Sequence, residues 1–529
     1  MFSLWLNNPF YFQQIFPSMS DWTSGYVADI GYTYGYYNEL NPHRATLALL
    51  NAGFVPPPNG VHCEMGYGQG LSVNVHSAAT GTTWYGTDFN PSQAAFAQSL
   101  ASASGADANL TDESFADFCN RNDLPDFDSI GLHGIWSWIS DENRTIIVDF
   151  IRRKLKVGGA LYLSYNTLPG WATFAPIRHL LSEHATVMGA PGDGVVGRID
   201  EALEFARRLF ETNPAFIRAN PNAAERFNKV SVQDRNYLAH EYFNKDWHPM
   251  HFGTLNKWLA PSKVTFACSA HYLDHIDVIN LTIEQQNLLQ TILDPVFKQS
   301  VRDFMVNQQF RRDYWIKGAR KLTLSQQSEL LKQHQMILIN PVDKILLTVS
   351  GALGEANLNK ESYEPILDLM ADHQARTIGE IAEKLKIKGV TFPQIVQALI
   401  VLAGAGHLAS VQANEFIQTA KKQSEKLNSY IINLSKSSSE IACLASPVIG
   451  GGILANRIEQ LFILAISENK NKINEWVDST WKILSEQNQR VLKDGKPMES
   501  VEENLNELKR LALEFSAKRL PILKQLQII

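Results

Sequence analysis

Residues 61–70 run Val61-His62-Cys63-Glu64-Met65-Gly66-Tyr67-Gly68-Gln69-Gly70, which predicts a buried strand, a glycine-rich turn and the start of a helix. Three glycines at alternate positions let the backbone turn tightly and let a ligand approach without a Cβ in the way. The next predicted strand, Trp84-Tyr85-Gly86-Thr87-Asp88, ends in an acid 18 residues after Gly70. A doubly wound sheet places a carboxylate on a bound ribose at about this spacing. The two stretches therefore predict a nucleoside-binding site.

Strands and helices alternate around this turn. Helices are predicted at 41–51, 91–102 and 144–154, the second with Asn90 as its N-cap and Pro91 at its first position. Such alternation calls for a mostly parallel sheet with helices on both faces, so we predict an α/β, Rossmann-like domain. The other strands of this sheet are expected at 127–132, 160–165, 263–267 and 277–281.

The remaining chain is predicted to be largely helical. Helix, helix and a short extended run at 376–412 resemble a winged-helix module, but no basic recognition helix is evident, so a nucleic-acid partner is not expected. A glycine break, Gly450-Gly451-Gly452, interrupts the last helices. The predicted domains are an N-terminal extension (1–25), a sheet domain (26–282) with a helical insertion at about 175–237, a helical regulatory or middle domain (283–375), the winged-helix-like module (376–412) and a C-terminal helical domain (413–529).

Composition narrows the class of protein. A chain of 529 residues with 45% hydrophobic and 19% charged residues is typical of a globular protein of several domains, and a net charge of −6 does not favour nucleic acid or an anionic membrane. The four cysteines form no CxxC pair, which favours a reducing compartment and excludes a cysteine-built zinc site. His248 and His251 resemble a metal pair but have no third ligand at suitable spacing, so no metal is expected.

The first 18 residues do not resemble a secretory signal. They contain no Lys or Arg, and Asn7, Asn8 and Pro9 interrupt the apolar run. Translation from Met19 is an alternative to translation from Met1. No stretch approaches the ~20 apolar residues that span a bilayer, so we expect a cytoplasmic protein.

The order of the glycines distinguishes between nucleoside cofactors. Dehydrogenases use GxGxxG, whereas this turn has Gly66, Gly68 and Gly70 and an acid, Glu64, just before them. That order is typical of class I S-adenosylmethionine (SAM) methyltransferases. SAM carries an α-ammonium rather than a pyrophosphate, which suits Glu64, while Asp88 accepts hydrogen bonds from the two ribose hydroxyls.

Two further segments are candidates for the site. Asp112 either accepts a hydrogen bond from the adenine amino group or caps a helix at 113–119, and both alternatives stay open. The segment 131–138, dense in His and Trp, follows a predicted strand and therefore belongs to the sheet edge where α/β proteins bind ligands.

The chain resembles bacterial SAM-dependent methyltransferases with a methyltransferase regulatory domain, a group that includes rickettsial outer-membrane-protein lysine methyltransferases. The resemblance rests on the turn at 64–70 and on 85–91, 133–138, 164–171, 237–242, 301–304 and 310–312. One departure is Tyr67, where the family often has Cys. The resemblance implies a class I fold, SAM as cofactor and a protein substrate. A surface or outer-membrane protein before its export is one candidate for this substrate. A homodimer is the candidate oligomeric state.

Methyl transfer requires a positioned nucleophile and a dry pocket. Trp136, Trp138 and Trp171 are the candidate walls of an acceptor pocket that lowers the pKa of a substrate lysine. His133 is the candidate general base, with an alternative role in holding the loop through a hydrogen bond. Tyr165 and Asn166 complete the candidate catalytic set.

Three functions stay open from the sequence. Methylation of protein lysine is favoured by the resemblance; methylation of a polysaccharide or small metabolite uses the same cofactor site; and a non-catalytic protein that senses SAM is the third. The charged runs Arg302-Asp303 and Arg311-Arg312-Asp313 either recognise an acidic substrate or form ion pairs that dock the helical domain, and docking is the favoured interpretation.

Overall fold

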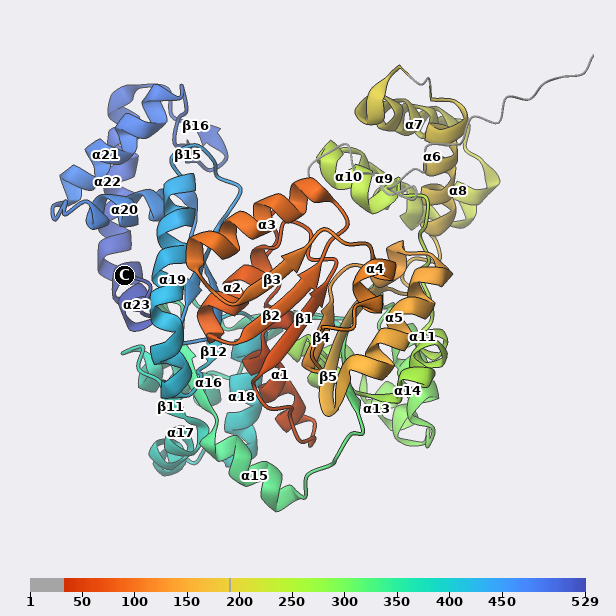
Figure 1. Ribbon diagram of the computed structural model, residues 1–529, viewed down its shortest axis with the longest axis horizontal. Coiled ribbons are helices and arrows are strands. Elements are labelled where there is room, and N and C mark those ends of the chain that lie inside the picture. The colour runs from red at the N-terminus through yellow and green to blue at the C-terminus, as the bar shows by residue number, and fades with distance from the viewer. Residues whose placement is uncertain (1–32, 190–191) are drawn as a thin grey trace, which may run out of the picture.

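A mixed seven-stranded sheet forms the centre of the molecule (Figure 1). The computed structural model describes residues 33–189 and 192–529, so the predicted extension at 1–25 and both candidate start residues lie outside the described residues. The order across the sheet is β3-β2-β1-β4-β5-β7-β6, and β7 runs antiparallel to both of its neighbours. The strands are β1 Val61–Met65, β2 Thr83–Thr87, β3 Ala108–Thr111, β4 Phe127–Leu132, β5 Leu155–Asn166, β6 Val264–Ser269 and β7 Phe310–Lys317.

The predicted α/β class is confirmed, and the helix after β2 begins where its predicted N-cap places it. The side chain of Asn90 accepts hydrogen bonds from two backbone N–H groups of α3, and Pro91 is the first residue of that helix. The side chain of Asn41 caps α1 in the same way. The helices packed on the sheet are α1 Pro42–Asn51, α2 Leu71–Thr80, α3 Pro91–Ser104, α4 Phe115–Asn120, α5 Asp141–Lys154 and α11 Phe252–Leu259.

The strand predicted at 277–281 is wrong, because Asp277–Asn280 forms the helical turn α12. The side-chain amide of Asn280 donates to the carbonyls of Leu273 and Ile276, which stabilises this turn. A short apolar run does not distinguish helix from strand. The other five predicted strands are present, and β3 and β7, which were not predicted, complete the sheet. Strand β7 has charged residues that conceal its strand pattern. It lies beyond the predicted boundary at 282, so we propose that the methyltransferase unit extends to Lys317.

Two apolar layers enclose the sheet. On one face, side chains of α4, α5 and α11 pack with those of β1, β4 and β5. On the other face, α1 packs against β5, β6 and β7, and α2 and α3 pack against β2 and β3. A separate helical lobe lies at the carboxyl ends of the parallel strands.

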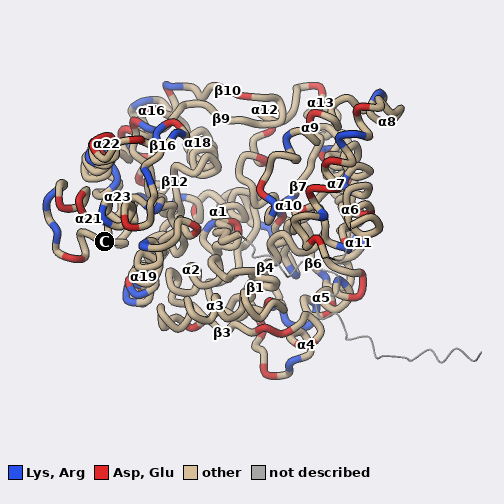
Figure 2. Tube along the Cα trace, turned by 90° about the horizontal axis from the view of Figure 1, so that it is seen from above, with Lys and Arg blue, Asp and Glu red and all other residues tan. Residues whose placement is uncertain are grey.

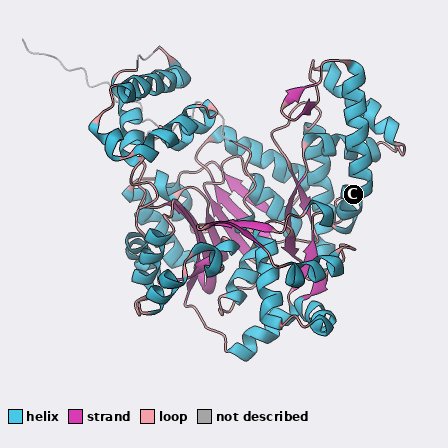
Figure 3. Ribbon diagram, turned by 180° about the vertical axis from the view of Figure 1, so that it is seen from behind, coloured by secondary structure: helices cyan, strands magenta, loops and turns pink. Residues whose placement is uncertain are grey.

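That lobe is the insertion predicted at about 175–237, and it stands apart from the sheet in Figures 1 and 3. Trp171, Phe174 and Tyr242 contribute to a core of its own. Its helices are α6 Ala175–Val187, α7 Gly194–Glu211, α8 Ala215–Ala219, α9 Pro221–Ser231 and α10 Arg235–Tyr242.

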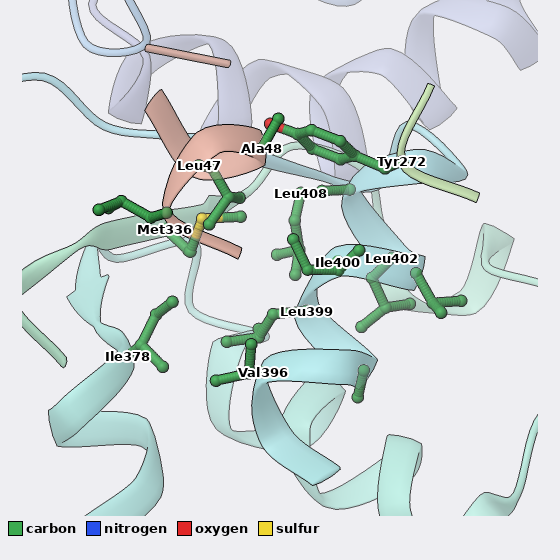
Figure 4. Close-up of a cluster of buried hydrophobic side chains, with 14 of the residues drawn as sticks. Leu47, Ala48, Tyr272, Met336, Ile378, Val396, Leu399, Ile400, Leu402 and Leu408 are labelled. Carbon is green, nitrogen blue, oxygen red and sulfur yellow. The ribbon is translucent and has the colours of Figure 1, made fainter. Parts of the chain in front are cut away.

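The middle of the chain forms a second, small sheet with helices. Strand β8 lies between β11 and β12, and α17, α18 and β12 follow in the helix–helix–strand order predicted at 376–412. Helix α18 is buried from Ile395 to Val401 apart from one residue and packs against α1, β8 and Tyr272 (Figure 4). The helix that would read DNA in a winged-helix module is thus a core helix. The elements are α13 Ile283–Gln290, α14 Pro295–Met305, α15 Leu324–Gln333, β8 Gln335–Leu338, β9 Thr348–Gly351, β10 Gly354–Asn357, α16 Lys360–Met370, β11 Arg376–Thr377, α17 Ile378–Leu385, α18 Phe392–Gly404 and β12 Leu408–Ser410.

The C-terminal region packs on the sheet domain through α19 and the hairpin β13–β14. All ten residues of α2 are buried, because this helix lies between the sheet and the C-terminal region. The elements are α19 Asn414–Leu434, β13 Cys443–Ser446, β14 Gly451–Leu454, α20 Arg457–Ser467, α21 Ile473–Glu486, β15 Leu492–Lys493, β16 Lys496–Pro497, α22 Val501–Glu514, a π-helical turn Phe515–Arg519 and α23 Leu520–Gln525.

Basic and acidic residues are interspersed along the chain (Figure 2). In the ranges 33–189 and 192–529, no single helix is long and apolar enough to cross a bilayer. Two consecutive helical segments, Ile378–Lys388 and Phe392–Gly404, are together long and apolar enough to do so by length and composition, but they are bent by 120° relative to each other.

Candidate active site

A cavity of about 1250 Å³ lies at the carboxyl ends of β1, β2, β4 and β5, beneath the helical lobe. This volume exceeds that of a typical pocket for one small ligand, roughly 300–1,000 Å³. Its sheet side is lined by Glu64, Gly66, Gly68, Asp88, His133 and Asn166. Its lobe side is lined by Trp171, Arg226, Lys229, Tyr237, Glu241 and Tyr242. The cavity therefore joins the predicted nucleoside site to a second region formed by the insertion.

The glycine turn adopts the left-handed backbone that its sequence requires. Gly66 and Gly70 have φ angles of 69° and 68°. A Cβ on Gly66 would lie 2.4 Å from Ile135 Cδ1, and one on Gly70 would lie 2.4 Å from the Cβ of Ala97. Gly70 ends the turn as the N-cap of α2. Glycine is thus required both for the backbone conformation and for the close packing of the turn.

Glu64 presents a buried carboxyl group with an unused oxygen. Glu64 is only 2% exposed, and its Oε2 has no hydrogen-bond partner within residues 33–189 and 192–529. Burial, with a smaller contribution from the charge of Asp88, raises the pKa of Glu64 to about 8. A buried acceptor of this kind is costly unless a ligand pairs with it. An ammonium group fits this carboxyl, and its pairing with the α-ammonium of SAM stays a prediction.

Asp88 is fixed by two backbone donors. Gly68 N–H donates to Oδ2 at 2.8 Å and Asn90 N–H donates to Oδ1 at 3.1 Å. Burial raises the pKa of Asp88 to about 6, although these two hydrogen bonds oppose the rise. Each carboxylate oxygen can accept a second hydrogen bond, so two vicinal hydroxyls of a ribose fit this side chain.

Asp112 is exposed and does not line the cavity. Neither does it cap the following helix: Ser114 is the N-cap of α4, and its side chain accepts from Asp117 N–H. The neighbouring Glu113, Ser114, Phe115 and Ala116 line the cavity instead. The sequence analysis therefore selected a segment that does reach the cavity, but it did not identify which residues of that segment face the cavity. The adenine contact of Asp112 stays a prediction.

His133 lies in the cavity wall between two aromatic rings. Its ring stacks on Tyr37 with centroids 3.6 Å apart, and its Nδ1 lies 2.8 Å from the hydroxyl of Tyr162. Burial lowers the pKa of His133 to about 4. The imidazole is therefore neutral at physiological pH and only weakly basic, which favours the alternative in which it shapes the loop over a role as general base.

The predicted tryptophan wall is divided between core and cavity. Trp136 is fully buried in the sheet core, where its Nε1 donates to Met250 Sδ, so it does not form the acceptor pocket. Trp138 and Trp171 do line the cavity. Trp247, which the sequence analysis did not single out, contacts both of them, with ring centroids at 6.3 and 5.0 Å. The Arg226 guanidinium lies over Trp171 at 4.1 Å, so this ring already holds a cation.

Asn166 lines the cavity at the end of β5, whereas Tyr165 points into the protein. Alternate residues of a strand face opposite sides, so only one of these neighbours reaches the site. The Tyr165 hydroxyl donates to Asp313, which also pairs with Arg311. The structure thus separates Tyr165 from the other candidate catalytic residues.

Arg311 belongs to an internal ion-pair network. It contacts Asp303 at 2.5 Å and Asp313 at 2.9 Å, and all three side chains are almost completely buried. Arg312 pairs with Glu39 at 2.6 Å. These pairs join β7 to α14 and to the N-terminal segment. The ion-pair alternative for the charged runs is therefore the one that the structure supports.

Several cavity residues came from segments without a recognisable motif. Thr33, Gly35 and Tyr37 line the cavity from an extended segment before α1, and the insertion supplies most of the opposite wall. Within the described ranges, no group of three or more His, Cys, Asp or Glu side chains is arranged to hold a metal ion. His248 lies near Asp246, and His251 stacks on Phe304.

Comparison with known proteins agrees with this fold. A family model described as a predicted methyltransferase regulatory domain matches residues 234–317, which include β6 and β7 and begin earlier than the predicted middle domain. PKMT2 from Rickettsia typhi, solved in complex with AdoHcy, superposes with a TM-score of 0.65 at 19% identity, covering 93% of this chain and 99% of that one. At this identity the likeness shows the fold.

Sequence relatives extend over nearly the whole chain. An uncharacterized protein of Synechocystis sp. is 38% identical over 512 residues, which cover 96% of this chain and 99% of that protein. An uncharacterized protein of Rickettsia prowazekii is 25% identical over 214 residues, covering 39% of this chain and 81% of that protein. The chain therefore belongs to the same family as the Synechocystis protein; it also matches the methyltransferase regulatory domain at 234–317 and shares its fold with PKMT2.

Proposed function

We propose that this protein transfers the methyl group of SAM to lysine side chains of a protein substrate. The observation that carries the proposal is the single cavity that contains both the Glu64–Asp88 end and the aromatic wall of the helical lobe. Glu64 and Asp88 would hold the α-ammonium and the ribose, and SAM supplies an electrophilic methyl group when bound. The rest of the cavity then receives the methyl acceptor.

The acceptor end combines aromatic rings with charges of both signs. Trp138 and Trp171 are cavity walls, and Glu142, Glu241 and Asp246 place carboxylates around them. Lys229 and Lys245 also line this end. Carboxylates attract a protonated lysine, and the apolar walls lower the pKa of its amine so that it loses its proton. Mixed charge suits a polypeptide segment better than a polyanion.

Positioning is the main task of the protein, because the sulfonium is already a good leaving group. Neutral His133, held by Tyr37 and Tyr162, lines the cavity between the two ends and supports the shape of this wall. Asn166 presents its side chain to the same cavity. The lobe forms the opposite wall of the cavity and limits the access of water to the reacting groups. The lysine proton leaves to solvent.

The decisive experiment follows the methyl group. The protein is incubated with cell extract and SAM carrying a tritiated methyl group, and the label is measured in protein, glycan and small-molecule fractions. Label in protein that survives as methyl-lysine after hydrolysis supports the proposal. Label only in glycan or small molecules overturns the lysine substrate, and no label in any fraction with intact SAM binding favours a SAM-sensing protein.

The matched control is Asp88→Ala, which removes the ribose acceptor and should abolish labelling in every fraction. A cytoplasmic location, a substrate met before export and a homodimer are further proposals from the sequence. Cell fractionation and sedimentation of the purified protein test the location and the dimer.

A further inference from the structure

The segment 33–41, which is irregular up to Tyr37 and continues into a 3-10 helical turn at Asn38–Leu40, lies between the cofactor cavity and the C-terminal region. Thr33, Gly35 and Tyr37 line the cavity. Tyr36, between them, contacts the hairpin β13–β14. The consecutive residues Tyr36 and Tyr37 thus face different partners, Tyr36 the C-terminal region and Tyr37 the cavity. We call residues 33–41 the strap.

On the cavity side the strap is part of the site. The Tyr37 ring stacks on His133, and its backbone N–H donates to Ser72 Oγ at 2.8 Å. Ser72 is the second residue of α2, the helix that begins directly after Gly70. A displacement of Tyr37 therefore changes both the His133 wall and the contact with the helix of the glycine turn.

On the other side the strap is held by the glycine break. Gly452 N–H donates to the Tyr36 hydroxyl at 2.7 Å, and the same hydroxyl lies 3.1 Å from His76 Nε2 of α2. The side-chain amide of Asn41 donates to the carbonyl of Ile449 at 3.3 Å. A Cβ on Gly452 would lie 2.3 Å from Cys443 Sγ and 2.9 Å from Cζ of Tyr36. The glycines at 450–452 thus permit a contact too close for any other residue.

The C-terminal region also holds α2 itself. Ser424 Oγ donates to the carbonyl of Ala78 at 3.0 Å, and Gln412 Nε2 donates to that of Ala79 at 2.7 Å. The strap, which lines the cavity, and α2, which follows the glycine turn, are therefore bound to the same C-terminal body.

We propose that the C-terminal region sets the SAM affinity of the cavity through Tyr36, a positioning residue that holds Tyr37 against His133. This inference rests on the proposed function, since it assumes that the cavity binds SAM. It assigns to the C-terminal region a role that neither the glycine turn nor the regulatory-domain segment supplies. Tyr36 acts without touching the cofactor.

The first test compares Tyr36→Phe with the wild-type full chain by calorimetric titration with SAM and with AdoHcy. Loss of the hydroxyl leaves Gly452 N–H without its partner, and we expect binding weakened about three- to tenfold, since a buried hydrogen bond contributes about that factor. The matched control is Ser446→Ala, which removes the hydrogen bond from the hairpin to the carbonyl of Leu526 without touching the strap. It should lower the Tm and leave the SAM affinity unchanged.

A double-mutant cycle identifies the route of the effect. If Tyr36 acts through Tyr37, the change Tyr36→Phe has no further effect on SAM affinity in a Tyr37→Ala background. Equal affinity of Tyr36→Phe and wild type, or full additivity with Tyr37→Ala, overturns the proposal. Failure of the wild type to bind SAM would instead overturn the proposed function.

Hydrogen exchange on the wild-type chain provides a test that needs no variant. Coupling is reciprocal, so saturating AdoHcy should slow exchange in the peptide 443–454, whose Gly452 amide bonds to Tyr36. An unchanged exchange rate there, with protection confined to the cavity walls, contradicts the coupling even if Tyr36→Phe does not fold.

Discussion

Gly68 donates its backbone N–H to the Oδ2 atom of Asp88 at 2.8 Å, which joins the glycine turn after β1 to the acid after β2. These two strands are parallel neighbours in the sheet, with Met65 opposite Thr87. The contact orients the carboxylate before any ligand binds. The two halves of the cofactor motif are thus one rigid unit rather than two separate contacts.

Asp88→Asn should weaken SAM binding about 100-fold or more. The amide cannot accept at both oxygens, so it loses either a backbone donor or a ribose hydroxyl, and each charged hydrogen bond is worth about 1.5–3 kcal/mol. Calorimetric titration measures the loss. Asp107→Asn is the control, because Asp107 bonds the exposed Thr83 hydroxyl outside the cavity. Equal loss in both variants would contradict the role of Asp88.

SAM affinity should rise with pH between about 6 and 8, because the carboxyl of Glu64 has a pKa of about 8 and must lose its proton to pair with an ammonium. Binding at pH 7 should release a proton, which titrations in buffers of different ionisation enthalpy detect. Glu64→Gln should weaken binding and abolish this pH dependence. A flat affinity profile in the wild type would remove Glu64 from the ammonium site.

The same carboxyl should make the unliganded protein less stable as pH rises. The pKa of Glu64 is higher in the folded state than in the unfolded state, so its contribution to stability is full below the unfolded pKa of about 4.3 and is lost as pH approaches 8. Glu64→Gln should therefore raise the Tm of the ligand-free protein more at pH 8 than at pH 5. Thermal unfolding at both values measures the difference.

His133 should not titrate in the pH–rate profile. Because burial lowers its pKa to about 4, no inflection near 6.5 should depend on this residue. His133→Asn should lower kcat or SAM affinity through the lost stack on Tyr37 but keep the wild-type profile from pH 6 to 9. Loss of an inflection in that range on substitution would restore His133 as general base.

Trp136 and Trp138 should differ in what their loss affects. Trp136→Ala opens a cavity in the sheet core and should cost about 3–5 kcal/mol of unfolding free energy. Trp138→Ala should cost less and instead raise the KM for the methyl acceptor, because this ring lines the cavity. Denaturant unfolding and steady-state kinetics separate the two effects. A larger KM effect for Trp136 would contradict the assignment of the wall.

Arg311→Met should destabilise the protein by about 3–5 kcal/mol, since it leaves Asp303 and Asp313 buried without their counter-ion. The exposed pair of Arg152 with Asp149 supplies the control, and Arg152→Met should cost only about 0–1 kcal/mol. Denaturant unfolding measures both. If Arg311 recognised substrate instead, the variant would keep its stability and lose acceptor binding.

The candidate cofactor site could be predicted from the sequence because its residues form local motifs. Glu64, the three glycines and Asp88 are close in the chain and are all needed for one turn, so residue type and spacing suffice to predict them. Helix caps at Asn41 and Asn90 are local in the same sense, since the side chain bonds the backbone next to it. The strand at 310–317 was not predicted, because its Arg and Asp residues pair with partners across the fold, and such pairing cannot be seen in the periodicity of the sequence.

The acceptor side depended on tertiary structure. Trp136 and Trp138 are two residues apart, yet one is buried in the core and the other lines the cavity, a distinction set by how the segment packs. Tyr37 and Arg226 line the cavity from two distant segments, and Trp247 packs on the cavity residue Trp171 from a third, so no spacing in the chain predicts that they meet. A local turn specifies its ligand through its own backbone, whereas a pocket assembled from remote elements exists only once the chain has folded.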